Sequence, residues 1–131
     1  SATGTTTTGL GGYGEIDIYF LFTSFTGTVS FADFFIDSRL DGTNYVNIGH
    51  SPAITSATGA TAQFLMSLSK RAYATGTLLG AGQLVNGLDV DVATGSVRSI
   101  NWGDDLRVRR TVSGGTTAPI FTYTITVNAN A

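Results

Sequence analysis

Apolar and polar residues alternate at every second position over much of this chain, and that period constrains its fold more than any other feature. In residues 15–23 the apolar face consists of Ile16, Ile18, Phe20 and Phe22. Successive side chains of a β-strand point to opposite faces, whereas a helix needs apolar residues three and four positions apart. The same alternation recurs in residues 45–48, 62–68, 88–92, 106–112 and 121–127. The sequence therefore predicts a series of short strands, each with one apolar face.

Turn-forming residues separate these segments at fairly regular intervals. Glycine follows a polar residue at Thr26-Gly27, Asp41-Gly42, Thr94-Gly95 and Ser113-Gly114. Such pairs are typical of the turns between strands. About eight strands without a long helical window predict an all-β fold, namely an antiparallel β-sandwich of the jelly-roll type.

Two finer expectations follow from the same pattern. Residues 106–112 and 121–127 flank a glycine-containing turn, so they are expected to form a hairpin with one buried face. Between Val29 and Ile36 the apolar residues share a face only if the strand bends or bulges near Ala32-Asp33. We therefore expect a sheet corner at that point.

The chain has 131 residues, of which 42% are hydrophobic and 12% charged, so it can build the core of one domain. We expect this domain to span residues 15–131. Residues 1–14 are rich in threonine and glycine and are predicted to form an extended N-terminal arm, either disordered or ordered against a neighbouring subunit. The glycines of this arm do not indicate a phosphate-binding loop, because no lysine follows them.

Charge and cysteine content bear on the partners and cofactors to expect. The formal net charge of -2 supplies no general attraction for nucleic acid or anionic lipid. No apolar run approaches the ~20 residues that span a bilayer. Without cysteine the chain can form neither a disulfide nor a thiolate metal site. The sequence thus predicts no cofactor, no nucleic-acid partner and no membrane partner.

Residues that could carry catalysis are few. A nucleophilic serine needs a nearby base. The only histidine, His50, precedes Ser51-Pro52 in a predicted loop. We expect His50 to be a solvated or structural residue there. The acidic pairs to consider for glycosidase chemistry or calcium are Asp37/Asp41, Asp89/Asp91 and Asp104/Asp105. Their spacing supports neither, and turns or polar strand faces account for them. We expect no catalytic residue, no metal ligand and no enzyme activity.

Basic, aromatic and arm residues are the candidates for binding. The predicted capsid- or subunit-binding residues are Thr5, Thr6, Thr7, Thr8, Leu10, Arg107, Arg109 and Arg110. Alternation puts Arg107 and Arg109 on one strand face, where they either contact another subunit or form ion pairs across the sheet. The expected partners for such ion pairs are Asp104, Asp105 and Asp89. Trp102 is predicted to seal the end of the sandwich, with stacking on a sugar as the alternative.

Within residues 95–127, a Trp102-Gly103 turn leads to the strand Leu106-Arg107-Val108, and a Phe121-Thr122-Tyr123 segment begins the last strand. In these features the chain resembles the capsid decoration, or cement, proteins of tailed bacteriophages. The resemblance implies a non-enzymatic homotrimer that binds the major capsid protein and stabilises the shell. It also implies a place on the virion surface after assembly in the host cytoplasm. Phage fibres and tails use similar sandwiches, so the alternative is a carbohydrate- or receptor-binding module.

Overall fold

The computed structural model describes residues 2–27, 31–55, 58, 61–69, 90–98, 102–114 and 120–130. The strands in this part of the chain are β1 (Ala2–Thr7), β2 (Glu15–Thr26), β3 (Phe31–Arg39), β4 (Tyr45–His50), β5 (Gln63–Ser69), β6 (Asp105–Ser113) and β7 (Ile120–Asn130). No helix that could cross a membrane occurs among these residues. The all-β fold predicted from the two-residue period is confirmed.

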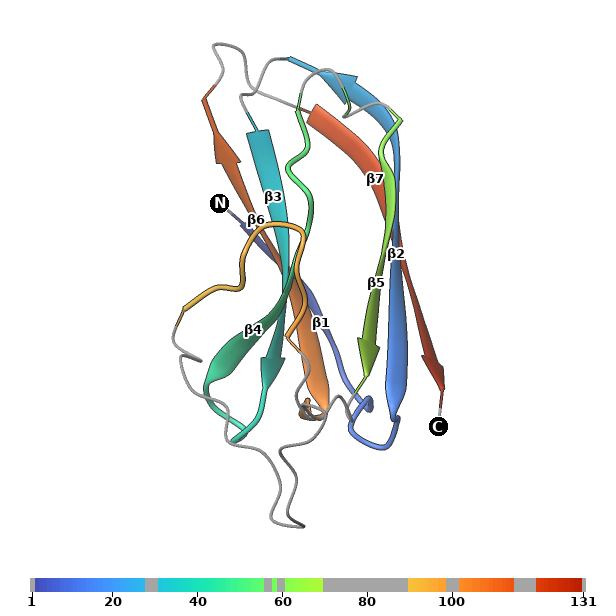
Figure 1. Cartoon of the computed structure of the whole chain (residues 1–131), viewed down its shortest axis with the longest axis vertical. Helices are drawn as coiled ribbons and strands as arrows, with labels where there is room; N and C mark the ends of the chain where they lie inside the picture. Colours follow the sequence, from blue (N-terminus) through green and yellow to red (C-terminus); the bar gives the residue numbers. More distant parts are fainter. Residues whose placement is uncertain are drawn as a thin grey trace, which may run out of the picture.

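The strands form two antiparallel sheets that face each other (Figure 1). The four-stranded sheet has the order β1-β6-β3-β4, and the three-stranded sheet has the order β5-β2-β7. Every strand pair in both sheets is antiparallel. The two apolar faces meet between the sheets, which is the arrangement of a β-sandwich.

The core lies between the central strands of the two sheets. The predicted apolar face of β2 is at most 1% exposed, and it packs against the even-numbered side chains of β3. Aromatic rings join the two strands, since the ring centroid of Phe34 lies 5.9 Å from that of Phe20 and 5.3 Å from that of Phe22. Burial of each such side chain stabilises the fold by about 1.5–3 kcal/mol, so this contact between the sheets is a main source of stability.

The sheet corner expected at Ala32-Asp33 is not present. β3 keeps one unbroken register against β6 over its whole length. Phe31 is 41% exposed, whereas Ala32 and Phe34 are fully buried. Because Phe31 turns away from the core, the strand needs no bend to keep the following apolar residues inside.

The expected hairpin of residues 106–112 and 121–127 is also wrong. These residues lie in β6 and β7, which belong to opposite sheets: β6 pairs with β1 and β3, and β7 pairs with β2. The alternation located both strands and their apolar faces correctly, but it carries no information on which strands pair. Residues 90–92, the described part of the strand expected at 88–92, lie outside any strand.

All four glycines of the predicted turns have a positive φ, with 91° at Gly27 and 73° at Gly114. Gly42 has φ 79° and Gly95 has φ 74°, a backbone region that favours glycine. The turn at Gly42 is held by the Asp41 carboxylate, which accepts hydrogen bonds from the backbone amides of Thr43 and Asn44 at 2.8 and 2.6 Å. This turn connects β3 to β4 as expected.

The segment expected as an arm contributes β1, which pairs with β6 of the same chain. Leu10 follows this strand and is buried in the core. Its amide donates a 3.0 Å hydrogen bond to the Asp104 carbonyl, and its carbonyl accepts a 3.0 Å bond from the Trp102 indole. Trp102 is itself buried, which confirms that it seals the sandwich.

Candidate functional site

Polar and aromatic side chains gather on the outer face of the four-stranded sheet. We call this group the outer-face cluster, and it consists of Asp33, Phe35, Asp37, Tyr45, Asn47, His50, Arg107 and Arg109. Alternation along β3 directs its odd-numbered side chains away from the core. The members from β3 are nevertheless buried, because residues 90–98 cross this face (Figure 1) and bond to it. The cluster therefore lies between the sheet and a covering segment.

Asp37 is the centre of the cluster. Its carboxylate lies 3.1 Å from Arg107 Nε and 3.0 Å from Arg109 Nε, and it accepts a 3.0 Å hydrogen bond from the Asn47 side-chain amide. A one-residue bulge in β4 brings Asn47 opposite Asp37. Burial of Asp37, which is 2% exposed, raises the pKa of the carboxyl. The hydrogen bonds from Arg109 and Asn47, the charge of Arg109 and the bond from Arg107 outweigh burial and lower that pKa below its ordinary 3.8.

Arg109 links the cluster to the covering segment. Its guanidinium lies 2.8 Å from the Asp91 carboxylate and 4.2 Å from the centre of the Phe35 ring. Hydrogen bonds to Asp37, with further contributions from Asp91, raise the pKa of Arg109 above its usual range. Arg109 is thus held on three sides by acceptors and a ring.

The ion-pair partners of Arg107 and Arg109 are not those expected from the sequence. Both arginines bind Asp37 instead. Asp105 pairs with Arg39, and Asp104 accepts a 3.0 Å hydrogen bond from the Gly11 amide. Asp89 lies outside the described residues.

His50 ends β4, and both of its ring nitrogens lie close to protein oxygens. Nδ1 lies 2.8 Å from the Val92 carbonyl oxygen, and Nε2 lies 3.1 Å from an Asp33 oxygen, in a contact without hydrogen-bond alignment. The ring packs at 4.2 Å from that of Phe35. His50 is therefore packed as a structural residue. It does not serve Ser51 as a base, because the Ser51 hydroxyl donates a hydrogen bond to the Pro52 carbonyl and accepts one from the Phe34 amide.

Tyr45 is covered by a cation rather than open to a ligand. The Arg107 guanidinium lies 3.8 Å from the centre of its ring, and that of Arg39 lies 5.5 Å away. The Tyr45 hydroxyl is 3.5 Å from the Thr6 hydroxyl of β1. Trp102, the residue considered for sugar stacking, is buried in the core, so Tyr45 and Trp102 both have structural roles.

The remaining predicted binding residues do not form one site. Thr5, Thr6 and Thr7 lie in β1, beside β6, and Thr8 and Leu10 follow that strand. Alternation places Arg110 on the face opposite to Arg107 and Arg109, in register with Phe34 of β3. The arm and the arginine face therefore meet through Thr6 and Tyr45, while Arg110 is directed elsewhere.

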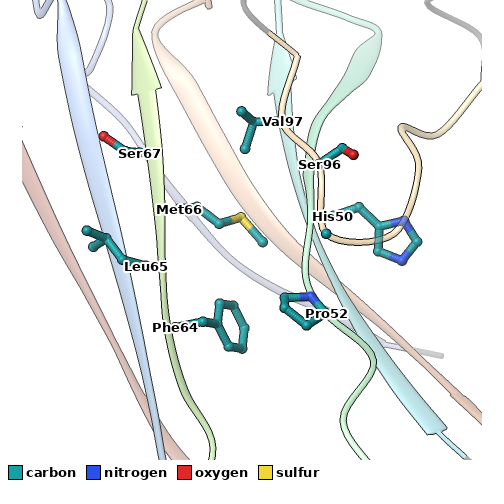
Figure 2. Close-up of a pocket in the computed structure, with 9 residues that line it drawn as sticks. His50, Pro52, Phe64, Leu65, Met66, Ser67, Ser96 and Val97 are labelled. Atoms are coloured by element: carbon teal, nitrogen blue, oxygen red, sulfur yellow. The ribbon is translucent and has the colours of Figure 1, made fainter.

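A separate cleft of about 270 Å³ opens between β5 and the end of β4. Figure 2 shows Phe64 and Met66 pointing toward Pro52, with Leu65 and Ser67 on the other side of β5. The His50 ring points away from the cleft (Figure 2). Apart from His50, the described residues of the lining are apolar or neutral, and none of them is a second ionisable side chain that could act as an acid or a base.

The described residues contain no group of three or more acidic or histidine side chains arranged to hold a metal ion. Comparison with known proteins found no matching family model, no matching curated protein and no matching solved structure. The site is therefore interpreted from its geometry alone. The pairing of Asp37 with the two arginines had no signal in the sequence, because the partners are 70 and 72 residues apart.

Proposed function

We propose that this chain is a non-enzymatic structural protein of a tailed phage, a decoration protein that binds the outer capsid surface as a trimer and stabilises the shell. The observation that carries the proposal is the internal neutralisation of the outer-face cluster. Asp37 and Asp91 are bound by Arg107 and Arg109, and the nitrogens of His50 face protein oxygens. These groups hold the fold together through ion pairs and hydrogen bonds, which suits a binding protein better than an enzyme.

The surface chemistry of the strands supports the same function. β1, β5 and β7 contain no charged residue and are rich in serine and threonine. The hydroxyl groups of such surfaces can both donate and accept hydrogen bonds with another protein. Three linked copies would convert weak contacts into lasting attachment through effective concentration.

The test is binding to shells of the phage from which the gene comes. Purified protein is mixed with emptied shells and sedimented, and the melting temperature of the shells is recorded with and without it. Saturable co-sedimentation in multiples of three per binding position, with a raised melting temperature, is expected. Absence of the protein from the pellet at excess concentration would exclude the proposal.

The cleft between β4 and β5 favours a second candidate, a carbohydrate- or receptor-binding module. Its size and mixed lining suit one sugar ring or one side chain of a partner. A glycan array separates this candidate from the first. Binding that is lost in Val97→Asp, at the cleft, and kept in Val90→Asp, an exposed site outside the cleft lining, would favour it.

A further inference from the structure

The free edge of β7 is an uncharged strand edge of unusual length. β7 runs for 11 residues without a charged residue, a proline or a glycine. It is the end strand of its sheet, and β2 is its only strand partner in the described part of the chain. Exposed edges of this kind recruit further strands, and proteins usually protect them with lysine, proline or a bulge. None of the side-chain protections is present in β7.

The sandwich is also incompletely closed along β7. The inward-facing side chains of β2 are at most 1% exposed, whereas those of β7 are only partly buried against the core. Val127 on the inner face remains 37% exposed, and Ile120 on the outer face is 64% exposed. A groove between β7 and the other sheet is lined by Thr7, Leu106 and Ile125, among others. Within the described part of the chain, this side of the molecule thus combines a strand edge that pairs with no other strand with apolar surface.

We propose that β7 pairs with β7 of a second copy of this chain, antiparallel and about a two-fold axis. The strand is chemically complementary to itself in this arrangement. A pairing centred on Ile125 sets Thr124 opposite Thr126 and Thr122 opposite Asn128 on the outer face. On the inner face it sets Tyr123 opposite Val127. Polar residues then meet polar ones, apolar residues meet apolar ones, and no like charges oppose each other.

The dimensions indicate a reversible contact. A strand of 11 residues is about 37 Å long and a sheet about 10 Å thick, so its edge covers about 370 Å². A stable complex buries about 800 Å² per partner. The edge supplies about half of that area, and we expect a dimer that forms and dissociates with concentration. The contact is independent of the proposed function, and its two-fold symmetry differs from the three-fold contact proposed above.

The experiment compares three full-length proteins by light scattering from about 1 μM to about 1 mM, a range that brackets weak complexes. Thr124→Lys places a charge at the centre of the pairing. Leu65→Lys adds the same charge on exposed β5, at the opposite edge of the same sheet. We expect the wild type and Leu65→Lys to dimerise alike. Thr124→Lys should dimerise at least about tenfold more weakly, because the two lysines then lie at diagonal positions on the same face of the paired strands and repel each other.

Mixing Thr124→Lys with Thr124→Glu is the decisive arm of the experiment. The mixture should dimerise more tightly than either variant does alone, while thermal melts show both variants folded. A wild type that stays monomeric over the whole range would overturn the proposal. A dimer or trimer whose mass is the same in Thr124→Lys would also overturn it. A trimer of that kind would still agree with the proposed decoration function.

Discussion

Replacing Asp37 with asparagine removes the one carboxylate that binds both Arg107 and Arg109. The substitution keeps the size of the side chain and leaves two partly buried cations without their shared counter-ion. Loss of one member of a buried ion pair costs about 3–5 kcal/mol. Both arginine side chains are about a quarter exposed, so water screens part of this cost. We expect Asp37→Asn to lower the free energy of unfolding by about 2–4 kcal/mol.

Thermal and urea unfolding at pH 7 measure this loss, which corresponds to a fall of about 10 °C in Tm for a chain of this size. The matched control is Asp91→Asn, which removes the exposed partner of Arg109 and should cost less than about 1 kcal/mol. If Asp37→Asn lowered the free energy of unfolding by no more than the control does, the outer-face cluster would not stabilise the fold as argued.

The pH dependence of the same difference supplies a second check. The folded-state pKa of Asp37 lies below its ordinary 3.8, so the ionised carboxyl contributes stability above that pH and loses it as the pH falls through the folded pKa. The stability gap between wild type and Asp37→Asn should be constant above about pH 5 and shrink below about pH 4. A gap that grows on acidification would contradict the assigned direction of the pKa shift.

Three further outcomes are expected. A Cβ at Gly103 would overlap the Arg39 carbonyl, so Gly103→Ala should cost about 3 kcal/mol in urea unfolding, whereas Gly12→Ala, with nothing near its Cβ, should be close to neutral. Trp102→Phe removes the indole hydrogen bond to a buried carbonyl and should cost about 1–3 kcal/mol by circular dichroism melts. The backbone amides that follow Asp41 lower its pKa to about 2; a carbon NMR titration midpoint near 4 would contradict that turn geometry.

The sequence predicts those parts of the fold that depend on local pattern. The apolar face of β2 is confirmed because each inward residue, from Ile16 to Phe22, meets the core and each neighbour faces outward. The pairing of β6 was predicted wrongly, because the glycine turn after Ser113 has the residues of a hairpin turn. The next strand nevertheless joins the other sheet. Strand partners depend on which apolar faces fit together, and that information is distributed over the whole chain.

The candidate site is less predictable for the same reason. Alternation correctly places Arg107 and Arg109 on one face, yet it does not identify Asp37 as their partner. Asp37 follows five consecutive residues that are all buried in the structure, so its surroundings resemble those of a core strand rather than a polar face. Residues 90–98 lie over this face, and their position explains both the burial and the charge pairing. No local sequence pattern predicts that position.

Burial of a strand on both faces has a consequence for where function resides. β3 contacts the core with its even-numbered side chains, and its odd-numbered ones are buried in the outer-face cluster, which residues 90–98 cover through bonds to Asn47, His50 and Arg109. Charges in such a position are tolerated only when they satisfy one another, so the outer-face cluster is bound to structure and is not free for a ligand. The uncharged sheet edges have no such obligation. Contacts with other proteins, whether with a shell or with a second copy, are therefore expected at the edges of the sandwich, and β7 offers the longest of them.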